Sequence, residues 1–206
     1  SIAQVVEENA LLKYEDKYHP AILKGVSDNY ERITGIDSMI VEGEFVLKNG
    51  NNNFAVIGQG VAYFLSVGLT FVSPIQIYVP KENATISMDP GQAFSRKFIY
   101  PSGIFAIQQE FDSKYILVPL DFAKELLGYE NQINALEVEI AKDAKVKEIK
   151  EEIKFILGAN YNVKDRFEQN ELLYKIMKSE KWAIFLILTF ILIIASFNII
   201  GSLTML

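Results

Sequence analysis

His19 is the only histidine in this chain of 206 residues, so it is the first side chain to consider for acid–base catalysis or metal binding. It stands next to Pro20 in a segment that reads as a strand, and nothing nearby supplies the serine and aspartate geometry of a catalytic triad. The acidic pairs Glu7-Glu8 and Glu151-Glu152 are adjacent in sequence, so their carboxylates point in different directions on a helix or a strand. We therefore predict no catalytic residue, no metal site and no cofactor, and a surface or strand-packed role for His19.

A second motif with chemical potential is Gly58-Gln59-Gly60, which follows an apolar strand, as the phosphate-binding glycines of nucleotide sites do. The third glycine and the downstream acidic residue of a dinucleotide site are missing, so a close contact between backbone and helix explains the motif better. The sequence has no P-loop and no cysteine, which excludes P-loop binding of ATP, disulfides and thiolate catalysis. A net charge of −6 without a basic stripe argues against a nucleic-acid partner.

The run from Trp182 to Leu206 carries no charged side chain. As a helix it would span roughly 37 Å, enough to cross a hydrocarbon core of about 30 Å. It stands at the end of the chain, so it is not a signal peptide, and a buried hydrophobic hairpin is the alternative interpretation. Because the chain opens on Ser1 without a leader and stops inside this run, we expect it to be a piece of a longer protein.

A helical pattern without proline or glycine leads into the apolar run. We predict a stalk helix over 165–181 that continues into a transmembrane helix over 182–206. An apolar stripe on the stalk is a candidate interface with a second subunit, and it consists of Leu172, Leu173, Ile176 and Met177. The alternative is that this stripe packs against the domain of the same chain. Small and polar residues in the apolar run suit close packing between membrane helices, and these are Ser196, Asn198 and Gly201.

The loop over 83–96 combines polar residues with a turn signal at Asp89-Pro90-Gly91. Apolar side chains on a protruding turn often mark a docking site. The candidate partner-binding residues of this loop are Ile86, Met88, Pro90, Phe94 and Arg96. The alternative is that these residues pack back onto the neighbouring strands.

Hydrophobic periodicity and turn signals predict the remaining elements. Strands are expected at 2–14, 18–26, 39–47, 54–57, 75–79, 97–100, 104–107, 115–118, 133–140 and 160–163. Helices are expected after Ser27, over 58–69, over 121–127 from a cap at Asp121, and from Asp143 onward, with Gly35, Gly128 and Gly158 as helix ends. This order predicts an α+β fold split by a β-rich insertion.

Four segments carry a resemblance to a known family: NALLKYEDKYHPAILKGV, IGQGVAYFLSVGL, PSGIFAIQQEFDSKYILVPLDFAKELLGY and KSEKWAIFLILTFILIIASFNIIGSLTML. Together they resemble the MacB-like periplasmic core domain and second membrane helix of FtsX-like ABC transporter permeases, most closely the lipoprotein-releasing permeases of the LolC/LolE type. The resemblance implies a porter-like βαβ subdomain over 1–57 plus 130–164 and an inserted, β-rich, sabre-like subdomain over 58–129. It places residues 1–181 in the periplasm of a bacterial inner membrane.

The resemblance also implies a non-catalytic permease subunit that transmits ATP-driven motion. Its expected partners are a cytoplasmic ABC ATPase on a separate chain, a second permease subunit, and a periplasmic lipoprotein chaperone or lipoprotein. Release of lipoproteins from the inner membrane is the first functional hypothesis. MacB-like efflux of small molecules or peptides and FtsX-like regulation of a cell-wall hydrolase are alternatives within the superfamily, and a membrane-tethered sensor or enzyme is the alternative from another class.

Overall fold

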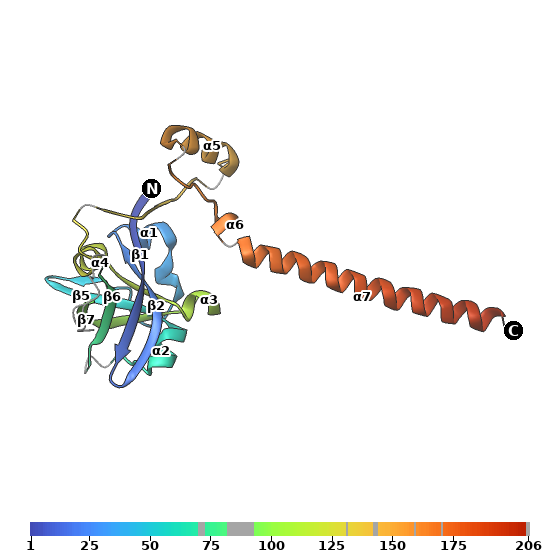
Figure 1. The fold of residues 1–206 in the computed structure, drawn as a ribbon, viewed down its shortest axis with the longest axis horizontal. Helices are drawn as coiled ribbons and strands as arrows, with labels where there is room; N and C mark the ends of the chain where they lie inside the picture. The colour runs from blue at the N-terminus through green and yellow to red at the C-terminus, as the bar shows by residue number, and fades with distance from the viewer. Residues whose placement is uncertain are drawn as a thin grey trace. The chain divides into compact units, whose positions relative to one another are not determined.

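The structure is a computed structural model that describes residues 1–69, 73–81, 93–130, 132–141, 144–158, 160–169 and 171–204. The chain forms two compact units, Ser1–Glu139 and Ile140–Leu206, which are considered separately. The first unit contains a mixed sheet with short helices, and the second contains helices (Figure 1). The strands are β1 (Ile2–Tyr14), β2 (Lys17–Val26), β3 (Ile40–Gly43), β4 (Lys48–Asn49), β5 (Asn52–Gly58), β6 (Ile75–Pro80), β7 (Phe94–Phe105), β8 (Tyr115–Pro119) and β9 (Ala135–Val138).

The main strands of the first unit close into a ring. Hydrogen-bonded neighbours follow the order β1–β2–β8–β5–β7–β6 and return to β1. The pairs β2–β8 and β5–β7 are parallel, and the other pairs of the ring are antiparallel. The unit is therefore a small closed barrel, with β3, β4 and β9 attached to single strands of the ring. Closure removes the exposed edges that an open sheet of these strands would present.

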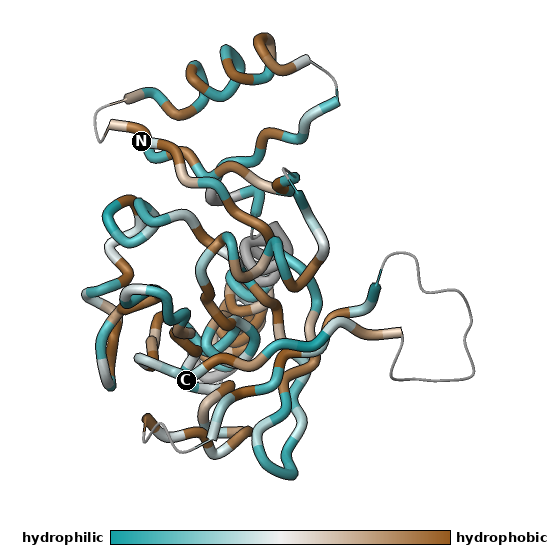
Figure 2. The backbone as a smooth tube through the Cα atoms, turned by 90° about the vertical axis from the view of Figure 1, so that its left-hand side faces the viewer, coloured by the Kyte–Doolittle hydropathy of each residue, from teal (hydrophilic) through white to brown (hydrophobic). Residues whose placement is uncertain are grey.

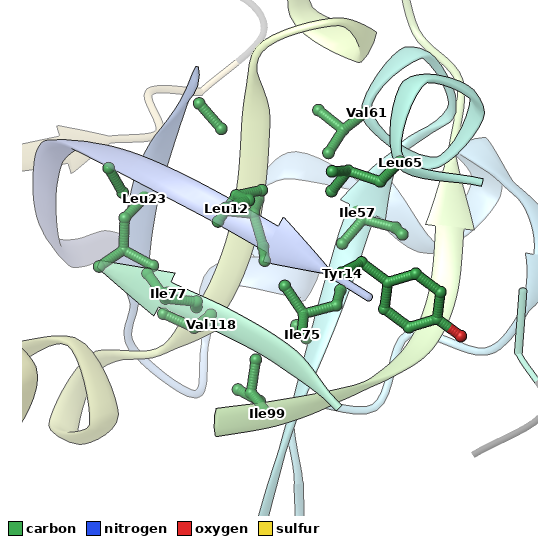
Figure 3. Packing of buried hydrophobic residues seen from close by; sticks show 14 of the residues in the cluster. Leu12, Tyr14, Leu23, Ile57, Val61, Leu65, Ile75, Ile77, Ile99 and Val118 are labelled. Carbon is green, nitrogen blue, oxygen red and sulfur yellow. The ribbon is translucent and has the colours of Figure 1, made fainter. Parts of the chain in front are cut away.

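The barrel is filled by alternate residues of its strands, because successive side chains of a strand point to opposite faces. Leu12, Leu23 and Ile57 are fully buried in this interior (Figure 3). Two helices, α2 (Gln59–Leu65) and α4 (Leu120–Leu127), add apolar side chains to the same cluster. A second cluster lies on the other side of β5 and β8, where α1 (Tyr30–Thr34) and the 3₁₀ helix η1 (Ile36–Met39) contribute buried residues.

Most of the predicted elements are present, with shifted boundaries. The predicted strands 2–14 and 18–26 form a hairpin, and Gly35, Gly128 and Gly158 terminate helices. The predicted strands 97–100 and 104–107 are parts of the single strand β7. The predicted caps were wrong at Ser27, whose hydroxyl accepts the amide of Gln4, and at Asp121, which lies inside α4 after the cap position Pro119. The short helix α3 (Gln109–Asp112) was not predicted.

The barrel differs from the expected division into a core and an insertion over 58–129. Strands β6, β7 and β8 come from the expected insertion, yet they pair with β1, β5 and β2 of the expected core. The compact units separate after Glu139 instead. These pairings join residues that are far apart in sequence, and hydrophobic periodicity carries no information about which strand lies beside which.

The second unit contains α5 (Val146–Leu157), α6 (Arg166–Gln169) and α7 (Glu171–Thr204). Apolar and polar residues alternate with the helical period along α5 (Figure 2). Asp165 and Glu168 form a capping box at the start of α6, and Lys150 of α5 forms ion pairs with both carboxylates. Residues 160–163 contain no strand, so that prediction was wrong.

Candidate membrane helix and interaction surfaces

Helix α7 has the length and composition of a membrane span. Its segment Ser179–Ile200 has a mean hydropathy of 2.8, and none of it is buried against other described residues. Thr189 and Ser196 donate hydrogen bonds of 2.8 Å to the carbonyls of Phe185 and Leu192, one helical turn earlier. These bonds satisfy hydroxyl groups that would otherwise be costly in hydrocarbon. The part of the predicted stalk from Glu171 onward is continuous with the apolar segment in α7, whereas the beginning of the predicted stalk belongs to α6.

The three candidate packing residues of α7 do not share one face. Successive residues of an α-helix are rotated by about 100°, so Ser196 and Asn198 are separated by about 200°. Asn198 and Gly201 are three residues apart and do lie on a common face. The candidate packing positions therefore form two faces, with Ser196 on the first and Asn198 with Gly201 on the second.

The predicted stalk interface lies on the first two turns of α7. The backbone positions of Leu172 and Ile176 share one face, and those of Leu173 and Met177 share the adjacent one, because each pair is four residues apart. Their side chains lie outside the described part of the structure. A role of these residues in contact with a second subunit stays a prediction.

The candidate docking loop is described only at its end. Ile86, Met88 and Pro90 lie outside the described residues, whereas Phe94 and Arg96 belong to β7. The Phe94 side chain is 43% exposed. The Arg96 guanidinium lies 5.2 Å from the centre of the Phe98 ring, a cation–π contact. The structure thus places two of the five candidate residues on an exposed strand face.

Strand β7 presents more aromatic surface than the sequence analysis identified. Phe94, Phe98 and Tyr100 alternate along the strand, and all three side chains are exposed. We call them the β7 aromatic stripe. The alternation in FSRKFIY was the signal that could have revealed it, because a period of two places every second side chain on one face. Exposed aromatic side chains beside an arginine are typical of protein-binding surfaces.

His19 has a structural role. Its ring stacks on Phe64 of α2 at 4.9 Å, and its Nε2 atom forms a hydrogen bond of 2.8 Å with the Ser113 carbonyl. The neighbouring Tyr63 side chain is 80% exposed, beside an open groove of about 710 Å³ along α2. These contacts agree with the prediction of a strand-packed histidine.

The glycines of Gly58-Gln59-Gly60 permit a close approach between α2 and α3. A Cβ atom at Gly58 would lie 2.2 Å from the Asp112 carbonyl oxygen, and one at Gly60 would lie 2.7 Å from the Ser113 Cα atom. The Asp112 carboxylate is occupied by a hydrogen bond of 2.8 Å from the Ile107 amide. The predicted packing explanation of these glycines is therefore confirmed. Among the described residues, no group of three or more histidine and acidic side chains is arranged to hold a metal ion.

A charged cluster near the beginning of β1 was missed by the sequence analysis. Lys24 of β2 forms ion pairs with Glu7 of β1 at 2.8 Å and with Glu137 of β9 at 2.5 Å. The Lys24 side chain is only 11% exposed, and its Nζ atom lies 5.3 Å from the centre of the Tyr30 ring. Glu137 is 113 residues away from Lys24 in the sequence, so no local pattern could have identified this cluster.

The electrostatics of this cluster favour a charged lysine. Burial alone would lower the pKa of Lys24, but the Tyr30 phenol and the carboxylates of Glu137 and Glu7 raise it, and the net shift is upward. Burial raises the pKa of Tyr30 and that of Tyr115, so both phenols stay protonated around neutral pH. Lys24 is thus a permanent cation between two acidic groups.

Comparisons with known proteins give a fold. No protein family profile matches the sequence, and no curated protein matches it. Among solved structures, the chain is similar to the extracellular domain of the ABC-type transporter YknZ from Gram-positive bacteria, with a TM-score of 0.51. The two sequences are 15% identical, and the match covers 80% of this chain and 77% of that chain. The periplasmic region of MacB from Actinobacillus actinomycetemcomitans is similar with a TM-score of 0.47 and 13% identity over 76% of this chain and 66% of that chain. At this level of identity, the similarity establishes that the chain shares the fold of an extracellular domain of an ABC-type transporter.

Proposed function

We propose that this chain is the extracytoplasmic domain and one membrane helix of an ABC transporter permease. The observation that carries the proposal is the combination of two features in one chain: a fold shared with such a domain over 80% of the chain, and the helix α7 with the properties of a membrane span. In this proposal residues 1–181 face the periplasm of a bacterial inner membrane.

The proposed role is mechanical and not catalytic. His19 and Asp112 are engaged in packing and in a backbone hydrogen bond, so neither is poised to react with a substrate. Hydrolysis of ATP would take place on a separate cytoplasmic subunit, and its motion would reach the barrel unit through the continuous helix α7. A long helix transmits displacement because its hydrogen bonds are all internal.

Association with an ATPase tests this general function. The parent protein, tagged and expressed in its own host, would be extracted with detergent and purified. We expect an ABC ATPase subunit to co-purify and to hydrolyse ATP after reconstitution in nanodiscs. A parent protein that spans the membrane but purifies without an ATPase would overturn the proposal in favour of a tethered sensor.

For the substrate, we propose release of lipoproteins from the inner membrane. The sequence resemblance to the LolC/LolE-type permeases supports this choice, and so does the exposed β7 aromatic stripe at the end of the candidate docking loop. Tyrosine and arginine side chains of this kind are the usual anchors of a protein–protein interface. The stripe with Arg96 would receive a periplasmic lipoprotein chaperone.

The substrate proposal is tested by depletion and by capture. Depletion of the parent protein should leave outer-membrane lipoproteins in the inner membrane. Phe94→Asp should abolish capture of the chaperone without unfolding the domain, because it places a charge on the exposed stripe. Tyr63→Asp is the matched control, since Tyr63 is an exposed aromatic residue on α2. Equal capture by Phe94→Asp and the unaltered protein would exclude the loop assignment, and normal lipoprotein sorting after depletion would favour efflux or hydrolase regulation.

A further inference from the structure

Strand β9 is the covalent exit from the barrel unit toward α7. It pairs with β1 in the register Ile2↔Val138 to Val5↔Ala135. Ser1 and Glu139 extend this ladder with hydrogen bonds of 3.2 Å and 2.9 Å in the two directions. The ring of strands closes without β9. Detachment of β9 from β1 would therefore leave the closed ring of strands intact.

The backbone ladder by itself attaches β9 only weakly to β1. It contains few residue pairs, and the Leu136 and Val138 side chains are 54% and 46% exposed, so little apolar surface is buried by this strand. The chain leaves the ladder at Glu139, beside Ser1, so a force applied there across the ladder would open the residue pairs one after another. Such a geometry loads one pair of hydrogen bonds at a time.

Side chains add a second attachment across this ladder. Lys24 connects β2 to Glu137 of β9 and to Glu7 of β1. Asn134, immediately before β9, accepts a hydrogen bond of 2.9 Å from the Glu7 amide and donates one of 2.5 Å to the Glu7 carbonyl. We call Lys24, Glu7, Glu137 and Asn134 the β9 latch. Because the Lys24 side chain is largely buried, its ion pairs are screened less than those between fully exposed side chains.

We propose that the β9 latch is the mechanical coupling between the barrel unit and the membrane segment of this chain. The latch keeps β9 on the barrel under load, so that a displacement arriving through Glu139 moves the barrel as one body. Without the latch, the same displacement peels β9 away and the barrel does not follow. This inference rests on the proposed transporter function.

Substitutions in the β9 latch can separate the coupling of motion from the folding of the barrel. The full-length permease with its ATPase would be reconstituted in nanodiscs, carrying Lys24→Met or Glu137→Gln. Lys97→Met is the matched control, because Lys97 forms an ion pair with Glu125 within the same unit but outside the latch. Amide hydrogen exchange, ATP hydrolysis and lipoprotein release would be measured for each variant.

We expect exchange of the β9 amides to accelerate by about tenfold or more in both latch variants, while the amides of β6 and β8 keep their protection. Lipoprotein release should fall at least tenfold while ATP hydrolysis continues, and Lys97→Met should behave like the unaltered protein. If Lys24→Met unfolds the whole barrel, Glu137→Gln decides the question, since it keeps the pair between Lys24 and Glu7.

A covalent staple provides the rescue. Ser1 and Glu139 form a hydrogen-bonded pair, so by alternation Gln4 and Leu136 form a non-hydrogen-bonded pair, whose side chains are close enough for a disulfide. This chain contains no cysteine, so Gln4→Cys with Leu136→Cys introduces its only thiols. Oxidation should restore release in Lys24→Met, and reduction with dithiothreitol should remove it again.

Three results would overturn the inference: unchanged β9 exchange in both latch variants, full release despite accelerated β9 exchange, or a staple that forms without restoring release. Failure of the proposed function looks different, because the unaltered assembly would then show neither ATPase association nor lipoprotein release.

Discussion

Apolar side chains of the same kinds are buried in one unit of this chain and exposed in the other. In the barrel unit, Leu12, Leu23 and Ile57 have no exposed surface, since they belong to the buried cluster between the strands and helices (Figure 3). In α7, Leu188 and Ile194 are each 60% exposed, and no described residue covers the apolar segment. The barrel unit can supply its own apolar environment, whereas α7 requires one from outside, and a lipid bilayer is the environment that its length matches.

This difference predicts opposite responses to the same type of substitution. Truncation of a side chain should destabilise the barrel unit, where a cavity remains, and should hardly affect α7 as a membrane span, because lipid would fill the space. Introduction of charge should have its largest effect in α7, because hydrocarbon solvates charge poorly.

The largest effect is expected for Leu188→Arg combined with Ile191→Arg in α7. Each arginine near the centre of a membrane helix costs about 2.5–3.5 kcal/mol in insertion free energy, so the pair should cost about 5–7 kcal/mol. The 206-residue chain expressed by itself, in which α7 is the candidate membrane span among the described residues, should shift from the membrane pellet to the supernatant in an alkaline carbonate extraction. Alanine at the same two positions is the control and should stay in the pellet. A double arginine variant that remains integrated would show that α7 is not a membrane span.

The second prediction compares truncations in the two units. Leu23→Ala removes a fully buried side chain and should lower the free energy of unfolding of the barrel by about 2–5 kcal/mol. Ile194→Ala, on the exposed surface of α7, should leave the barrel unchanged. Denaturant titration of the detergent-solubilised protein, followed by near-ultraviolet circular dichroism, measures both. Equal losses for the two variants would contradict the separation of the two environments.

A smaller effect is expected for Gly58→Ala at the contact between α2 and α3. The added Cβ would lie 2.2 Å from the Asp112 carbonyl oxygen, and relief of this overlap should cost about 1–3 kcal/mol in unfolding free energy. Gly68→Ala serves as the control, because a Cβ atom added at Gly68 would have no neighbouring atom within 4 Å and the φ of Gly68 is not positive. Differential scanning fluorimetry should show a lower Tm for Gly58→Ala alone.

The smallest effect concerns the surface ion pair of Lys48 and Asp121 at 2.7 Å. The hydrogen bond from Lys48 holds the pKa of Asp121 below its ordinary value of 3.8. This pair therefore stabilises the fold above about pH 4, and the contribution is lost as the pH falls through the lowered pKa of the folded state. Asp121→Asn should cost about 0.5 kcal/mol near pH 7, because both side chains are exposed, and nothing near pH 2. A loss that persists unchanged at pH 2 would assign the effect to something other than charge.

Sequence patterns predicted the structure best where one element determines its own environment. The β-branched and large apolar residues of 2–14 predicted the strand β1, and the uncharged run after Trp182 predicted a helix that is present in α7, because the composition of one segment indicates its own local structure. The spacing in Gly58-Gln59-Gly60 likewise indicated a packing contact before the structure gave its partner, Asp112. Helix caps were less well predicted, since Ser27 has competing backbone partners in the folded chain.

The order of the strands and the β9 latch were decided by the tertiary structure. A strand pattern records that a residue is buried and leaves open which strand lies beside it, so the expected insertion over 58–129 was not recognised as part of one closed barrel. Lys24 reads in sequence as an ordinary solvated lysine, and only the pairing of β1 with β9 brings Glu137 beside it. The local periodicity of a sequence indicates which side chains are buried and which are exposed to solvent. The pairing of strands depends on contacts between residues far apart in sequence, and these contacts form only when the chain folds.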